Sequence, residues 1–149
     1  MAELVRAFFP GHTVKLAKTK TDNFGSDCLI CCEYKIYENI LQITITIYIN
    51  GNQAERYVVD SDWNNTVNQV KYRRNLKNTI KLALYDALSK FTGNDIKWGA
   101  LTGIRPTKIV HELMDKGLDK KQMLDVLYDK YRVSIKKSDL LIEIAEIQR

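Results

Sequence analysis

The sequence feature that most constrains the fold is a run of nine residues, 41–49, in which apolar and polar side chains alternate. Because successive side chains of a strand point to opposite faces of a sheet, this pattern predicts a β-strand with one buried face. The pair Asn50-Gly51 follows directly and is the preferred sequence for a type I′ turn. We therefore expect a hairpin whose second strand covers residues 54–59. The residues expected to face inward are Leu41, Ile43, Ile45, Ile47 and Ile49.

Two further segments are strand candidates. In residues 28–37 the side chains of one face are apolar and alternate with polar ones, which predicts a strand. Glu38-Asn39 lies between this segment and residues 41–49 and predicts a tight turn. Residues 12–17 form a weaker candidate. Together these segments predict an antiparallel β-meander of about four strands.

Helical spacing of apolar residues marks two segments of the first half. The first ten residues read as the end of a helix, which Pro10-Gly11 stops, and residues 66–91 read as a long helix. Gly93 suits the left-handed position that follows a helix C-terminus. One side of the long helix is expected to carry five exposed cations: Lys71, Arg73, Arg74, Lys77 and Lys81.

The chain after residue 98 lacks any strand pattern and predicts three helices. The first begins at Pro106 and runs to Lys116, before Gly117. The second follows Asp119, which forms a capping box with Gln122, and ends near residue 131. The third follows Ser134, with a predicted apolar stripe of Leu140, Leu141, Ile144 and Ile147.

The fold class is therefore α+β, with a meander packed by a long helix and followed by a three-helix tail. We divide the chain into a sheet-and-helix unit, residues 1–95, and a helical segment, residues 96–149. The 149 residues carry a net charge of +5, which permits an anionic partner without requiring one. No secretory signal opens the chain and no apolar run approaches the roughly 20 residues of a membrane span, so we expect a cytoplasmic protein.

The three cysteines, Cys28, Cys31 and Cys32, do not predict a metal site. They lie within one expected strand, whose alternation places Cys31 on the face opposite the other two. A thiolate site needs about four converging ligands, and the histidines His12 and His111 lie in different parts of the chain. We therefore expect structural cysteines in a reducing compartment and no metal bound to this chain.

Residues 97–108 are the strongest candidate for a binding site. Pro106 is expected to begin a helix, whose free N–H groups attract anions. Arg105, Lys108 and Lys97 add cations that suit a carboxylate or phosphate. The alternative, favoured by the chemistry alone, is a shaped linker without a ligand. In either case the scaffold consists of Trp98, Gly99, Thr102, Gly103 and Pro106.

The string WGALTGIRPTKIVHELMDKG, residues 98–117, resembles the region before the catalytic core in one bacterial family. That family is the oxygen-independent coproporphyrinogen dehydrogenases of the HemZ type, which are radical-SAM proteins. The preceding helix and LDKKQMLDVLYDKYRVS, residues 118–134, fit the same order of elements, so the resemblance covers roughly residues 66–149. The strand-rich first half matches only in position and general character.

The resemblance implies a barrel-like core with a [4Fe–4S] cluster and S-adenosylmethionine, which oxidatively decarboxylates two propionates of coproporphyrinogen III. Three cysteines spaced C-x-x-x-C-x-x-C hold that cluster, and this chain lacks the pattern. We therefore expect a non-catalytic N-terminal accessory domain. Its partners would be the core of the same polypeptide and a porphyrinogen substrate.

Two other functions remain open at this stage. The basic side of the long helix suggests a small nucleic-acid-binding module, although no aromatic residue interleaves the cations. A solvated helix face explains the same charges and is favoured. The third possibility is a purely structural or dimerising domain.

Overall fold

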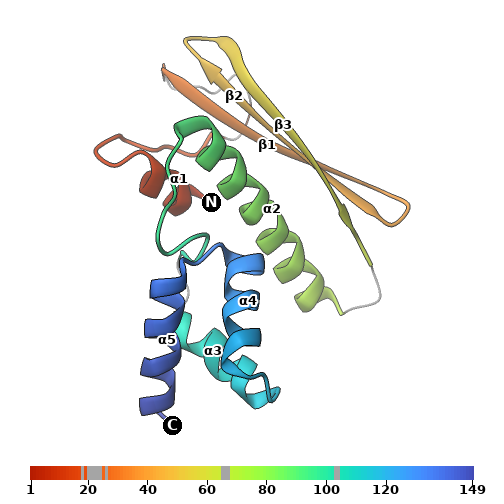
Figure 1. The fold of residues 1–149 in the computed structure, drawn as a ribbon. Coiled ribbons are helices and arrows are strands. Elements are labelled where there is room, and N and C mark those ends of the chain that lie inside the picture. The colour runs from red at the N-terminus through yellow and green to blue at the C-terminus, as the bar shows by residue number, and fades with distance from the viewer. Residues whose placement is uncertain (18, 20–24, 26, 65–67, 103–104) are drawn as a thin grey trace. The chain divides into compact units, whose positions relative to one another are not determined.

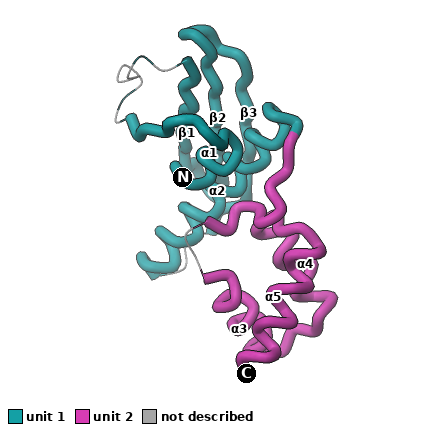
Figure 2. The backbone as a smooth tube through the Cα atoms, turned by 90° about the vertical axis from the view of Figure 1, so that its left-hand side faces the viewer, with its two compact units in different colours: residues 1–93 teal, residues 94–149 magenta. Residues whose placement is uncertain are grey.

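The computed structural model describes residues 1–17, 19, 25, 27–64, 68–102 and 105–149. They form two compact units, residues 1–93 and 94–149, which are described separately (Figure 2). The first unit holds the sheet with helices α1 and α2, and the second holds α3, α4 and α5 (Figure 1). The α+β class is thus confirmed.

The sheet is an antiparallel meander of β1 (Cys28–Tyr37), β2 (Ile40–Ile49) and β3 (Asn52–Asp62), in that order. A two-residue turn at Glu38-Asn39 joins β1 to β2, with Tyr37 opposite Ile40. The predicted hairpin turn between β2 and β3 is also confirmed. Asn50 and Gly51 have φ of 49° and 81°, the positive values that a type I′ turn requires.

Strand β2 supplies the centre of the apolar core in the first unit. Leu41, Ile43, Ile45 and Ile47 are each 0% exposed. Helix α2 contacts all three strands and lies against the sheet (Figure 1). The alternation of residues 41–47 therefore predicted the buried face correctly.

The prediction of about four strands was wrong by one. Residues 13–17 adopt no regular structure, and His12 lies in a bend. An extended segment becomes a strand only when its amides pair with a neighbour, and the ladder of the described sheet begins at Cys28. Strand β3 is longer than the predicted range of 54–59, since it spans Asn52–Asp62.

Helix α1 spans Ala2–Phe8 and packs on α2. The rings of Phe8 and Tyr85 meet edge to face, with centroids 5.3 Å apart. Helix α2 spans Gln69–Thr92, and its predicted start at residue 66 lies outside the described residues. Gly93 ends α2 with φ of 69°, as predicted.

Three helices make up the second unit: α3 (Pro106–Asp115), α4 (Lys120–Tyr131) and α5 (Ile135–Ile147). Their apolar faces share one core. The predicted capping box is confirmed, since Gln122 N donates to Asp119 Oδ1 at 2.8 Å and Asp119 N donates to Gln122 Oε1 at 3.0 Å.

The predicted apolar stripe of α5 was partly wrong. Leu141 is buried, but Leu140 is 40% exposed and Ile147 is 85% exposed. The buried face of this helix consists of Ser138, Leu141, Ile142 and Ala145. Because α5 carries apolar residues around much of its circumference, spacing alone did not identify the side that packs.

Among the described residues, no helix is both long enough and apolar enough to cross a membrane.

Candidate functional site

The turn that opens the second unit is built around Trp98 and Gly99. Trp98 packs against the core of the second unit, and the Nζ atom of Lys137 lies 4.9 Å from the centroid of its ring. Gly99 has φ of 58°. A Cβ atom at this position would lie 2.0 Å from the carbonyl oxygen of Tyr131, so a side chain does not fit without movement of that backbone.

Two backbone hydrogen bonds tie this turn to the end of α4. Ala100 N donates to the carbonyl oxygen of Tyr131 at 2.7 Å, and Ser134 N donates to the carbonyl oxygen of Lys97 at 3.0 Å. The close approach at Gly99 makes the first of these bonds possible. Part of the motif therefore has a structural role, which is to join the segment before α3 to the end of α4.

The predicted cations lie on both sides of the turn. Arg105 is the N-cap residue of α3, and Pro106 occupies the first helical turn, as predicted. Lys108 N donates to the carbonyl oxygen of Arg105 at 3.1 Å, so Arg105 and Lys108 share one helical turn. The side chains of Arg105, Lys108 and Lys97 are exposed. Thr102 is half-buried, and Gly103 lies outside the described residues.

This arrangement has the chemistry of an open anion site. Pro106 has no N–H group and the N–H of Lys108 donates to Arg105, so the attraction for a negative charge comes mainly from the positive end of the helix dipole. Arg105 and Lys108 add two cations at that end. Whether the site takes a ligand stays a prediction.

The basic side of α2 is smaller than predicted. Lys71, Arg73, Arg74 and Lys77 are exposed, but Lys81 is only 7% exposed. Lys81 lies three residues before Leu84 and four before Tyr85, both buried, and the ring of Tyr85 contacts Phe8 of α1. Lys81 is therefore on the side of α2 that faces α1. Burial, followed by the charge of Lys77, lowers the pKa of Lys81. The prediction of five exposed cations was therefore wrong for Lys81.

The cysteines of this chain do not fit an iron–sulfur cluster. Cys32 lies opposite Ile45 and Cys31 lies opposite Thr46, so the two side chains project from opposite faces of the sheet. In the described parts of the chain, no three histidine, cysteine or acidic residues gather as metal ligands would. Cys28, Cys31 and Cys32 therefore cannot together ligate such a cluster in this arrangement.

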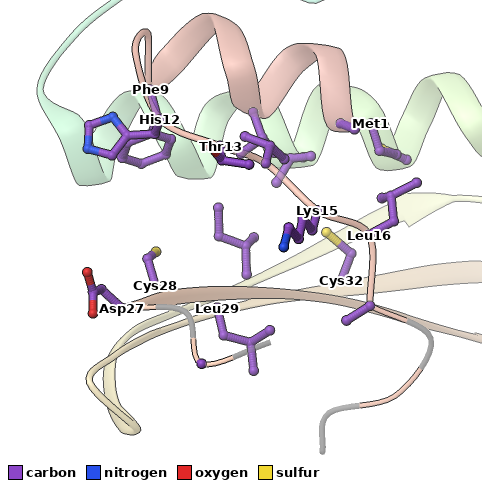
Figure 3. Close-up of a pocket in the computed structure, with 17 residues that line it drawn as sticks. Met1, Phe9, His12, Thr13, Lys15, Leu16, Asp27, Cys28, Leu29 and Cys32 are labelled. Carbon is purple, nitrogen blue, oxygen red and sulfur yellow. The ribbon is translucent and has the colours of Figure 1, made fainter. Parts of the chain in front are cut away.

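Sequence reasoning missed a pocket of about 540 Å³ in the first unit. It lies between α1, the segment that follows α1, and β1 (Figure 3). The sequence did not indicate this pocket, because its lining residues come from four short segments and none of these segments carries a motif. Its side-chain walls include Val5, Phe9, Val14, Lys15, Cys28, Ile30, Cys32 and Leu84.

The two cysteines of the pocket are poor nucleophiles. Figure 3 shows the side chains of Cys28 and Cys32 directed from β1 towards α1, while Leu29 points to the other side of the strand. Burial raises the pKa of Cys28, and burial with the neighbouring Cys31 raises the pKa of Cys32 to about 11. Both thiols are therefore protonated and uncharged near neutral pH.

Comparison with known proteins gives one informative match. The chain is 39% identical over 75 residues to the oxygen-independent coproporphyrinogen-III oxidase-like protein HemZ of Bacillus subtilis (strain 168). The predicted resemblance to the HemZ type is confirmed. The match covers 50% of this chain but only 15% of the HemZ protein. No family model matches the chain, and no solved structure matches it.

Proposed function

We propose that this chain is a non-catalytic accessory portion of a coproporphyrinogen-III oxidase-like radical-SAM enzyme of porphyrin biosynthesis. The observation that carries the proposal is the 39% identity over 75 residues to the HemZ protein. The C-x-x-x-C-x-x-C pattern expected for the cluster is absent from the sequence, which fits an accessory rather than a catalytic role.

The partner of this accessory portion is the catalytic core of the same polypeptide. On this proposal that core, and not the present chain, holds the [4Fe–4S] cluster and S-adenosylmethionine. The arrangement of Cys28, Cys31 and Cys32 supports this division, because their side chains diverge from one strand.

The contribution of the accessory portion to catalysis is the binding of substrate carboxylates. Coproporphyrinogen III carries four propionates, and a helix N-terminus with Arg105 and Lys108 has the matching charge. Lys97 lies just before the same turn and adds to the positive potential. Gly99 and Trp98 hold the segment that leads to this helix.

Two experiments test the proposal at different levels. The first determines the coding sequence after Arg149, where we expect C-x-x-x-C-x-x-C within a few tens of residues. A stop codon directly after Arg149 contradicts the accessory role. The second measures KM and kcat for coproporphyrinogen III in the full-length enzyme carrying Arg105→Ala or Lys108→Ala.

We expect each substitution to raise KM about five-fold, because one exposed charge contact contributes roughly 1 kcal/mol. The value of kcat should stay near that of the wild type, since the reacting atoms lie elsewhere. Lys116→Ala is the matched control, as this exposed residue lies at the opposite end of the same helix. Unchanged KM in both test variants contradicts the carboxylate contact while leaving the accessory role to the first experiment.

A further inference from the structure

We propose that the pocket between α1 and β1 binds an amphiphilic anion, a molecule with an apolar body and a carboxylate. This site lies in the first unit and is separate from the helix start at Arg105. Its volume of about 540 Å³ falls within the range of ligand cavities in proteins, roughly 300–1,000 Å³. The proposal does not depend on the enzyme assigned above.

Apolar side chains from four segments form the walls of the pocket. Val5 and Phe9 come from α1 and the residue after it, Val14 from the following segment, Ile30 from β1 and Leu84 from α2. Contact with such a surface stabilises an apolar body by removing it from water.

The thiols of Cys28 and Cys32 extend this apolar surface. An uncharged thiol behaves as a small hydrophobic group. Protein atoms surround Cys32 on several sides, although its side chain keeps access to solvent through the pocket. A protonated thiol is a poor ligand for a metal ion, which favours an organic ligand over a metal.

The cation that lines the pocket is Lys15, which comes from the wall opposite β1, and Figure 3 shows its side chain directed into the space between the two walls. The acidic residue that lines the pocket, Asp27, directly precedes Cys28 at the other end of this part of β1. This charge distribution orients the ligand, with its carboxylate towards Lys15 and Cys32 and its apolar body towards Phe9.

Laurate is a suitable probe, and its affinity for the 149-residue chain can be measured by titration calorimetry beside that of the uncharged dodecanol. We expect laurate to bind more tightly than dodecanol. Lys15→Gln should weaken laurate binding about five-fold, the effect of one exposed ion pair, and leave dodecanol unchanged. Lys35→Gln is the matched control, because Lys35 lies on the other face of β1.

The three cysteines report the location of the ligand within the same chain. We expect laurate to slow the alkylation of Cys28 and Cys32 by N-ethylmaleimide, followed by mass spectrometry, and to leave Cys31 unaffected because it faces away from the pocket. Val14→Trp, which fills the pocket, should abolish the protection in a variant whose circular dichroism is unchanged.

The same alkylation experiment is repeated with coproporphyrin III, because a fatty acid and a tetrapyrrole both combine an apolar body with a carboxylate. If coproporphyrin III slows the alkylation of Cys32, the pocket accepts a tetrapyrrole. If laurate slows it and coproporphyrin III does not, the ligand is an acyl chain. The proposal is overturned if neither compound protects Cys32, or if dodecanol binds as tightly as laurate. Neither outcome changes the KM test at Arg105, so the two proposals fail independently.

Discussion

At the scale of single residues, Gly99 shows how a backbone position dictates residue type. Gly99 was predicted to belong to the scaffold of residues 97–108, but the reason for a glycine at this position appeared only in the structure. The positive φ would already disfavour a side chain, and the carbonyl groups of Tyr131 and Arg132 occupy the space that a Cβ atom would need. The neighbour that excludes a side chain is about thirty residues away in sequence, so no local pattern reveals it.

We expect Gly99→Ala to lower the free energy of unfolding by about 3 kcal/mol, because strain at positive φ adds to a steric clash with backbone. Gly117→Ala is the control, since Gly117 also has positive φ, 76°, but open space around it. Its cost should be about 1 kcal/mol, from the conformation alone. Urea unfolding of both variants checks the difference, and equal costs would show that the close approach does not matter.

At the scale of elements, features that depend on adjacent residues were predicted correctly, whereas features that depend on contacts between distant parts of the chain were not. The turn at Asn50-Gly51 and the capping box at Asp119 depend on a few adjacent residues, and both were predicted. Residues 12–17 failed as a strand because pairing depends on a distant edge. The stripe of α5 failed because the choice between two apolar sides depends on where the other helices lie.

The capping box gives a prediction for α4. Asp119→Ala should destabilise the second unit by about 1 kcal/mol, because the N–H group of Gln122 loses its acceptor. Ser134→Ala at the start of α5 should cost less, as the Ser134 side chain makes no capping hydrogen bond. Thermal unfolding monitored by circular dichroism distinguishes the two variants, and a larger loss for Ser134→Ala would contradict this assignment.

At the scale of the whole molecule, the chain consists of two units with separate apolar cores. Leu41 and Leu127 are both 0% exposed, one in each unit. We expect Leu41→Ala or Leu127→Ala to cost about 2–5 kcal/mol and to speed amide hydrogen exchange only in the mutated unit. Exchange that rises in both units for either variant would indicate a single cooperative body.

The two candidate sites differ in how visible they were in the sequence. The segment from Lys97 to Lys108 is continuous, so its glycines, proline and cations were recognised together. The pocket near Cys32 is discontinuous, and its cysteines were correctly placed on two faces but only as structural residues. Helix periodicity also failed at Lys81, whose long aliphatic stem lets a charged residue lie on a packed side.

The hydrogen bonds between Lys97 and Ser134 and between Ala100 and Tyr131 have a topological consequence for the second unit. They close residues 97–134 into a loop, with both ends held at one place and α3 and α4 along its length. The entropy lost on closing a loop grows only slowly with its length, so one narrow contact can hold a loop of this size. The chain therefore enters and leaves this loop at a single junction, after which α5 returns to pack against α3 and α4.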